Sequence, residues 1–297
     1  MRSDTISRQK PSDMHHGISI LVRTFNSGKT LDQVLSRMKL AVDDEIIIVD
    51  SGSNDNTLEI AEKHGARIII SPPPFNYSRT LNEGFSVVRN PWVLVISSHC
   101  IPTHSGLLER MREVVSNADP QLVVAYGKSY IRIPEEISNQ VEIGGIDEWK
   151  NGRLHPGGNV LALYRTDIWK RYPFDESLAT AEDMAWFICV AEAGYRAAVV
   201  HDAMVLYRNQ GSLRHMFRKG WIEAHLAKSM CHTPVPQWNA LREIKFFLIG
   251  LASLMKMLIG RRIPPSTFVR QVAHRCGSHL ASIFPLTNSS SNTRLRP

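Results

Sequence analysis

The 297-residue sequence is poor in cysteine, and its four cysteines are widely separated. Cys100, Cys189, Cys231 and Cys276 form no Cys-x-x-Cys pair and no tight cluster with histidine. This spacing argues against a disulfide framework and against a structural zinc site, and it fits a reducing compartment. We therefore expect a cytoplasmic protein held together by a hydrophobic core, for which a hydrophobic content of 43% is sufficient.

The sequence also lacks an apolar leader. Residues 1–16 are polar, which predicts a disordered lead-in and not a signal peptide. Near the other end, the apolar run from Phe246 to Gly260 is interrupted by Lys256 and falls short of the roughly 20 residues that span a bilayer.

Acidic residues are scarce in one region. Between Met204 and Arg275 there are twelve Lys or Arg residues and only two acidic residues, Glu223 and Glu243. The net charge of this segment is +10, in a chain whose net charge is +7. Basic residues flank the apolar run, so residues 242–275 are expected to lie on an anionic membrane surface, which would make the protein peripheral on the inner membrane face. A buried core helix or a homodimer contact is an equal alternative. Aliphatic runs, and not stacking aromatics, interleave the charges, so no nucleic-acid partner is expected.

Short β-branched runs alternate with amphipathic segments in the first hundred residues. Strands are predicted at 17–26, 44–50, 66–71 and 91–99, with helices at 27–41, 57–66 and 78–89. After Cys100 the alternation loosens: a helix is predicted at 105–118, strands at 121–131 and 159–165, an irregular stretch at 134–158, a helix at 181–194 and a strand pair or bent strand at 195–208. The pattern predicts an α/β fold, with a mainly parallel sheet flanked by helices.

The predicted domain organisation follows from the same pattern. One domain is expected at 17–210, with a regularly alternating half at 17–102 and a half with looser alternation at 103–210. A basic, apolar helical region at 211–285 and a flexible tail at 286–297 follow it.

Three predicted strands end in polar residues. The first ends in residues 23–26 (Arg-Thr-Phe-Asn), the second in 50–55 (Asp-Ser-Gly-Ser-Asn-Asp) and the fourth in 97–99 (Ser-Ser-His). Any one of these clusters could consist only of turn residues and helix caps. Because ligands bind beyond the carboxyl ends of strands in open α/β sheets, three clusters at one edge indicate a binding site.

Five blocks in a fixed order carry a family resemblance: "ISILVRTFN", "EIIIVDSGSNDNTLEIAEKHGARII", "NYSRTLNEGF", "PWVLVISSHCIP" and "FDESLATAEDMAWFICVAEAGYR". From Gly17 to Tyr207 the chain resembles family 2 glycosyltransferases, which are inverting enzymes with the GT-A fold. The resemblance implies transfer of a hexose or deoxyhexose from a nucleotide-sugar donor to a hydroxyl group of a glycan or glycolipid acceptor, as in cell-envelope polysaccharide synthesis.

The resemblance also implies a donor site. Phe25 is expected to stack on the base, Asp50 to accept a hydrogen bond from a ring N–H, and Arg79 to face the diphosphate, because a guanidinium matches phosphate geometry. For Ser53 and Asp55 the alternative is helix capping, and for Arg79 it is a surface ion pair. The residues implied to bind the nucleotide sugar are Thr24, Phe25, Asn26, Asp50, Ser53, Asp55, Arg79, Asn82, Ser98 and His99.

On the acceptor side the resemblance implies a general base. Asp183 matches the aspartate of the family's Glu-Asp element and would deprotonate the acceptor hydroxyl. The residues implied to bind the acceptor are Gly157, Gly158, Asn159 and Glu182. As an alternative, the two acids simply complement the dipole of a helix N-terminus.

The sequence departs from the family where the family has Asp-x-Asp. The aligned residues, Ser97, Ser98 and His99, include no carboxylate, a pattern that resembles a rhamnosyltransferase-like subgroup. Three alternatives follow: His99 is one ligand of a divalent cation (Mn²⁺ or Mg²⁺), His99 meets the diphosphate without a metal, or the site is inactive. Tyr207 stands where many relatives have a histidine, which weakens the metal alternative, and Arg208, Arg214 and Arg218 are alternative sources of positive charge. No organic cofactor is expected.

Two rival functions follow from the same residues. One is a catalytically inactive nucleotide- or glycan-binding relative. The other is a nucleotidyltransferase on a similar sheet, which would need carboxylates at the fourth strand to hold its metal.

Overall fold

The computed structural model describes residues 17–208, except 117, 155, 156 and 179, together with residues 269, 271, 272 and 276. The predictions for 1–16, for 211–285 and for the tail at 286–297 therefore fall outside the described residues, apart from those four positions. The same holds for the membrane or dimer contact predicted at 242–275. Within the described part of the chain, none of the helices has the length and apolar character that crossing a membrane requires.

Sixteen elements make up the described part of the fold, in the order β1 (Ile18–Thr24), α1 (Leu31–Ser36), β2 (Glu45–Asp50), α2 (Thr57–Lys63), β3 (Arg67–Ile70), α3 (Tyr77–Phe85), β4 (Trp92–Ser97), β5 (Cys100–Pro102), α4 (Leu107–Ser116), β6 (Leu122–Tyr130), β7 (Val141–Gly144), α5 (Ile146–Lys150), β8 (Leu161–Arg165), α6 (Thr166–Arg171), α7 (Glu182–Glu192) and β9 (Arg196–Tyr207).

The strands form one nine-stranded mixed sheet in the order β3-β2-β1-β4-β8-β6-β9-β5, with β7 also paired to β9. The first four strands are parallel, as their β-branched sequences and intervening helices predicted. Strand β8 then joins antiparallel to β4, so the two predicted halves of the domain share a single sheet. The α/β prediction is confirmed.

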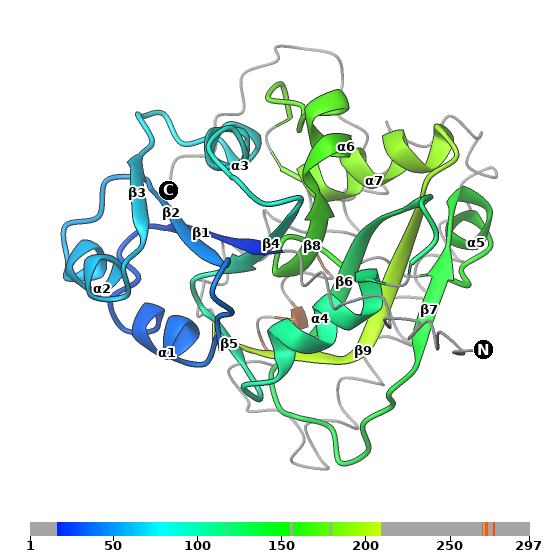
Figure 1. The fold of residues 1–297 in the computed structure, drawn as a ribbon, viewed down its shortest axis with the longest axis horizontal. Helices are drawn as coiled ribbons and strands as arrows, with labels where there is room; N and C mark the ends of the chain where they lie inside the picture. The colour runs from blue at the N-terminus through cyan, green and yellow to red at the C-terminus, as the bar shows by residue number, and fades with distance from the viewer. Residues whose placement is uncertain are drawn as a thin grey trace, which may run out of the picture.

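Helices cover both faces of this sheet (Figure 1). Alternate residues of β1 point to opposite sides, because side chains of a strand alternate between faces. Ile20 and Val22 pack with α1, α2 and α4 in one core, whereas Leu21 packs with α3, α6 and α7 in the other. Both cores are formed from buried hydrophobic residues, which explains why the middle positions of these strands are apolar on both faces.

The predicted irregular stretch at 134–158 contains two elements, β7 and α5. Each has five residues or fewer, and β7 is ordered by antiparallel pairing with β9, more than fifty residues later in the chain. Such short elements carry too little periodicity to be found from sequence, and helix α6 (six residues) was missed for the same reason. The 195–208 segment is one long strand, whose pairing with β6 shifts register between Tyr126 and Lys128.

Candidate active site

The parallel register brings the polar ends of three strands together. Thr24 at the end of β1 lies opposite Asp50 of β2, and Arg23 lies opposite Ser97 of β4. These positions form the carboxyl edge of the parallel part of the sheet, where ligands bind in open α/β folds. The sequence prediction that these clusters meet is therefore correct in its geometry.

Asp50 is fully buried and holds this edge together. One of its carboxylate oxygens, Oδ2, accepts the hydroxyls of Thr24 at 2.7 Å and Ser53 at 2.5 Å, and the other, Oδ1, accepts the backbone N–H groups of Gly52 at 2.9 Å and Ser53 at 2.8 Å. Four internal donors use the acceptor sites of a carboxylate. Its carboxylate therefore fixes the β2 turn, and Thr24, 2% exposed, is one of its donors, while contact of Asp50 with the base stays a prediction.

The loop after β1 lies next to the turn that Asp50 fixes, and it is accessible to solvent. Phe25 is 50% exposed, although it is a large hydrophobic residue at the edge of the sheet. Asn26 has a positive φ of 47°, a conformation that asparagine adopts more readily than most residues. An exposed aromatic ring beside a fixed turn has the arrangement that stacking on a nucleoside base requires.

The turn after β2 is tied to the loop after β1. The Asn26 side-chain oxygen accepts the Asn54 N–H at 2.8 Å, while the Ser53 hydroxyl accepts the Asn26 N–H at 2.8 Å. Asp55 accepts the N–H groups of Gly28 and Thr57, and its hydrogen bond from the Thr57 hydroxyl is the main reason that its pKa is lowered. Ser53 and Asp55 thus shape the turn through internal hydrogen bonds, although the N-cap residue of α2 is Asn56.

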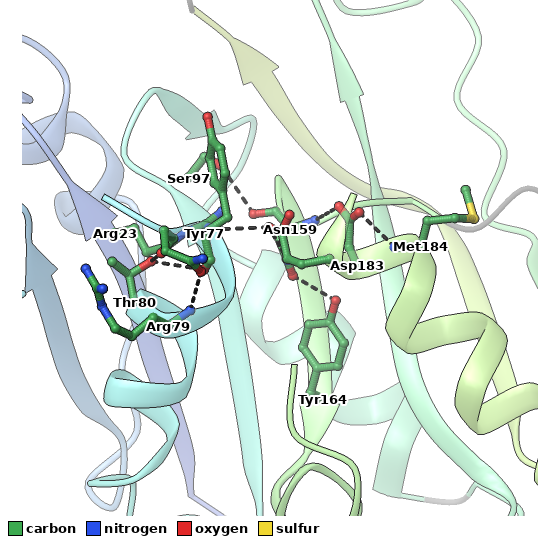
Figure 2. Close-up of polar contacts among 11 residues, drawn as sticks. Arg23, Tyr77, Arg79, Thr80, Ser97, Asn159, Tyr164, Asp183 and Met184 are labelled. Atoms are coloured by element: carbon green, nitrogen blue, oxygen red, sulfur yellow. Dashed lines mark hydrogen bonds and ion pairs between the residues drawn. The ribbon is translucent and has the colours of Figure 1, made fainter. Parts of the chain in front are cut away.

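Arg79 does not face the carboxyl edge. Its guanidinium donates to the carbonyls of Pro72 and Pro74 and pairs with Glu83 at 3.5 Å on the same helix, α3. In Figure 2 its side chain extends away from Asn159 and Asp183. In this placement the guanidinium stabilises the loop before α3, and the expected phosphate contact stays a prediction.

Asn82 also differs from the expectation. Its amide nitrogen donates to the Phe174 carbonyl and to Glu176, both at 2.9 Å, and its oxygen accepts from Trp169 at 3.0 Å and from the Phe174 N–H at 3.1 Å. All four hydrogen-bonding sites of the amide are used. Asn82 therefore joins α3 to the loop before α7 and has no group left for the donor.

At the end of β4 the three residues Ser97, Ser98 and His99 have different surroundings. The Ser97 hydroxyl donates to the Asn159 carbonyl at 3.2 Å, and the buried Ser98 hydroxyl pairs with that of Ser27 at 2.8 Å. His99 is partly exposed, and its ring meets the ring of Tyr207 edge-on with centroids 5.0 Å apart. The structure therefore places Tyr207 directly beside His99, while Ser98 serves the packing of the edge.

This set of side chains does not fit a resident divalent cation. The two serine hydroxyls are neutral and already engaged, so His99 is the one strong metal ligand in the turn, and Mg²⁺ prefers several oxygen ligands. Among the described residues, no group of three His, Cys, Asp or Glu side chains is arranged to hold a metal ion. An ion at this edge would have to take its other ligands from a diphosphate and from water.

Two adjacent acids begin helix α7. Ala181, which precedes them, has a left-handed backbone with φ of 61°, a strained conformation for alanine. Glu182 is 5% exposed, whereas Asp183 is partly exposed. As a whole residue, Asp183 is therefore the more exposed of the two acids.

Asn159, just before β8, holds both acids. Its backbone N–H donates to Asp183 Oδ2 at 3.0 Å, and its side-chain amide donates to Glu182 Oε1 at 3.1 Å. The buried hydroxyl of Tyr164 donates to the Asn159 side-chain oxygen at 2.8 Å. Figure 2 shows Asn159 between Tyr164 and Asp183, with Ser97 linking it to the end of β4.

Two of the residues predicted to bind the acceptor make hydrogen bonds within the protein. Asn159 is 4% exposed and its polar groups take part in internal hydrogen bonds, and Glu182 is 5% exposed and accepts from Arg23 and Asn159 through Oε1. Contact of either residue with an acceptor stays a prediction. Both act on Asp183, a role that sequence patterns do not reveal because it depends on contacts more than twenty residues apart.

Asp183 has an unusual pKa for an aspartate. Burial and the neighbouring Glu182 charge raise the pKa to about 6, against the opposing effects of the Asn159 and Met184 N–H groups and of Arg23. The Met184 N–H binds Oδ1 at 2.8 Å, so each oxygen accepts one backbone donor and keeps one lone pair. A partly exposed carboxylate with a pKa near neutrality is well suited to accept a proton.

Gly158 allows this carboxylate to take its position. A Cβ atom on Gly158 would lie 2.5 Å from Asp183 Oδ2, and one on Gly157 would lie 3.0 Å from the Tyr126 Cβ. Both distances are shorter than normal van der Waals contact. Glycine is therefore required at position 158 for packing beside Asp183.

Comparisons with known proteins agree with this fold. The family model described as glycosyl transferase family 2 matches residues 19–180, more than half of the chain. The O-antigen chain rhamnosyltransferase RfbN of Salmonella typhimurium is 23% identical over 223 residues, covering 68% of this chain and 69% of RfbN. The O-antigen chain rhamnosyltransferase WbaN of Salmonella anatum is 25% identical over 193 residues, covering 59% of this chain and 60% of WbaN.

Solved structures share the fold. The mannosyltransferase PcManGT from Pyrobaculum calidifontis, in complex with GDP-Man and Mn²⁺, superposes with a TM-score of 0.61 at 15% identity, over 93% of this chain and 90% of that one. Glucosyl-3-phosphoglycerate synthase from Mycobacterium tuberculosis, in complex with Mg²⁺ and UDP, superposes with a TM-score of 0.58 at 17% identity, over 74% and 81% of the two chains. The chain therefore belongs to glycosyl transferase family 2, and it is a glycosyltransferase.

Proposed function

We propose that the protein transfers a sugar, with inversion, from a nucleotide-sugar donor to a hydroxyl group of a glycan or glycolipid acceptor, with Asp183 as the general base. The single observation that carries this proposal is the contrast within the acidic pair. Glu182 is buried and paired, whereas Asp183 is partly exposed, has one lone pair left on each oxygen and has a pKa of about 6.

The proposed reaction has one displacement step. As the acceptor oxygen attacks the anomeric carbon, its proton passes to a carboxylate oxygen of Asp183. The new carbon–oxygen bond forms on the face opposite the leaving group, and the electron pair of the broken bond leaves with the nucleoside diphosphate. This inversion needs no enzyme nucleophile, which is consistent with a single accessible carboxylate.

The donor side is proposed to bind the nucleotide at the carboxyl edge of β1, β2 and β4. Phe25, exposed beside the turn that Asp50 fixes, would stack on the base. His99, beside Tyr207, would meet the diphosphate as it leaves. The similarity to RfbN and WbaN, which are named rhamnosyltransferases, makes nucleotide-activated rhamnose the first donor to test, and an O-antigen-like glycan the first acceptor.

The test replaces Asp183 with Asn and measures nucleoside diphosphate release from a panel of nucleotide sugars, with and without acceptor. We expect the turnover of Asp183→Asn to fall by about 10²- to 10⁴-fold, because the proton acceptor is lost. A thermal shift with the nucleoside diphosphate should persist, because the donor edge is unchanged. Asp167→Asn is the matched control: Asp167 also lies in the first turn of a helix, but it pairs with Arg165.

Two outcomes would overturn the proposal. If Asp183→Asn keeps more than about a tenth of the turnover, another group accepts the proton. If the wild-type protein binds nucleotides but turns over none of the donors, the inactive binding relative is the better description.

The role of a metal is tested separately by thermal shift. Because His99 is the one strong ligand in its turn, we expect Mn²⁺ alone to leave the melting temperature unchanged. Adding nucleoside diphosphate should raise it, and repeating this with chelator shows whether an ion enters together with the diphosphate. A clear stabilisation by Mn²⁺ alone would show that the protein has a metal site of its own.

A further inference from the structure

The acidic pair has one cationic neighbour, Arg23, among the groups that act on Asp183 in the described part of the chain. Arg23 lies near the end of β1, while Glu182 begins α7, so their contact joins the donor side of the sheet to the acceptor side. Arg23 Nη1 lies 3.3 Å from Glu182 Oε1 and donates to the Tyr77 carbonyl at 3.1 Å. The guanidinium also stacks over the Tyr77 ring, 5.1 Å from its centroid.

These contacts hold the guanidinium in one place. The Arg23 side chain is 15% exposed, and the carboxylate that it meets is 6% exposed. When an ion pair is removed from water in this way, loss of one partner leaves a buried charge uncompensated. Figure 2 shows Arg23 and Tyr77 on the opposite side of Asn159 from Asp183.

Glu182 Oε1 is shared between two donors. Arg23 approaches it from β1, and the Asn159 amide approaches it at 3.1 Å. Because Asn159 also holds Asp183 through its backbone N–H, movement of Glu182 would disturb Asp183 as well. The position of Asp183 therefore depends on the ion pair between Arg23 and the adjacent residue, Glu182.

The charged and titratable groups around Asp183 come from four elements. Glu182 on α7 raises the pKa of Asp183, and Arg23 on β1 lowers it. Tyr126 on β6 and Tyr164 on β8 are fully buried, and their own pKa values are raised by burial, so both stay neutral near pH 7. The balance between Arg23 and Glu182 is therefore what sets the charge around Asp183.

We propose that Arg23 is a positioning residue for the transfer reaction, which pairs with Glu182 across the active site and so keeps Asp183 ionised and aligned as the base. This inference rests on the proposed role of Asp183. It explains why a buried glutamate can lie next to a base that must carry charge.

The direct test is a titration of the Asp183 carboxyl carbon by ¹³C NMR in full-length protein with labelled aspartate, with Asp183→Asn identifying the signal. In Arg23→Met the cation is lost and the like charge of Glu182 remains, so the Asp183 titration should move upward by about one pH unit. The corresponding turnover should fall about fivefold at pH 6 and change little at pH 8.5, because the ionised fraction is then restored.

The second variant tests the mechanism itself. The single substitution Glu182→Gln removes the like charge, so the pKa of Asp183 in this variant should lie below the wild-type value. In Arg23→Met/Glu182→Gln both charges are absent, and the titration should return toward that of the wild type. Arg23→Lys keeps the charge and should stay close to the wild type even if Arg23→Met does not fold.

The matched control is Arg165→Met. Arg165 also pairs with a carboxylate, Asp167, and donates to a backbone carbonyl, that of Pro120, but it lies at the opposite edge of the sheet. Its removal should leave the Asp183 titration unchanged. The inference is overturned if Arg23→Met titrates as the wild type does, or if the double variant titrates like Arg23→Met. Because the titration needs no donor, these results are independent of whether Asp183→Asn abolishes transfer.

Discussion

Two aspartates illustrate how the same side chain serves structure in one region of the molecule and chemistry in another. Asp50 on the donor side is fully buried and accepts four internal hydrogen bonds. Asp183 on the acceptor side is partly exposed and accepts two, both from backbone N–H groups. Four donors leave no capacity for a substrate, whereas two leave one lone pair on each oxygen.

The difference also shows in the surrounding charge. The hydrogen-bond partners of Asp50 are hydroxyl and backbone N–H groups. Asp183 lies beside a second buried acid, and its pKa is raised to about 6. The comparison suggests that a site for proton transfer is recognised by an incomplete set of donors and not by the presence of a carboxylate at a strand or helix end.

The largest effect is expected for Asp50→Ala, which removes the aspartate with the structural role. Removing this buried acceptor leaves four donors without a partner, so we expect the free energy of unfolding to fall by about 3 kcal/mol or more. Urea denaturation of the variant and of Asp55→Ala measures this. Asp55 is exposed and caps a turn, so its loss should cost only about 1 kcal/mol.

The opposite result would change the assignment of Asp50. If Asp50→Ala is nearly as stable as the wild type but its KM for the donor rises sharply, Asp50 contacts the nucleotide after all, and the two aspartates do not differ as described.

The next largest effect is expected for Gly158→Ala, which displaces Asp183, the proposed base. The added methyl group would overlap Asp183 Oδ2, so the carboxylate must move. We expect turnover to fall about 10- to 100-fold, because a displacement of about 1 Å at a reacting group is enough to do this. Gly106→Ala, where the nearest contact would be 3.3 Å to His104, is a control for the substitution itself. Equal turnover in Gly158→Ala and the wild type would mean that the position of Asp183 is not critical.

The smallest effect is expected in the pH dependence of stability. The folded-state pKa of Asp183, about 6, lies above the value of 3.8 for the unfolded chain. The folded state therefore binds the proton more tightly, and ionised Asp183 costs stability above pH 6, a cost that disappears as the pH falls below 4. Asp183→Asn should be more stable than the wild type by about 2 kcal/mol at pH 8, with a smaller difference at pH 4.5. A difference that is independent of pH would argue against the raised pKa.

Sequence patterns identified the parallel half of the sheet and the edge at which polar residues meet. The apolar runs ending at Thr24, Asp50 and Ser97 each carry enough β-branched residues to mark a strand. Position alone then gives the site, because parallel strands end at the same edge. Asp183 could be selected in the same way, since it lies in the first turn of a long helix within a recognisable block.

The roles of individual side chains at the edge could not be obtained in this way. Asn82 is occupied by Phe174 and Trp169, about ninety residues later in the chain, and Arg79 is occupied by the carbonyls of a proline-rich loop. Nothing in the local sequence distinguishes these residues from ligand-binding ones. The role of Arg23 likewise depends on a glutamate 159 positions away.

The central claim is that Asp183 accepts the proton in the transfer step, and the pH dependence of kcat/KM for wild-type transfer tests it most directly. The acidic limb of that profile should have an apparent pKa of about 6, because the base must be ionised and its pKa is raised by burial and by Glu182. An acidic limb near pH 4, or a rate that is flat from pH 8 down to pH 5, would contradict the assignment.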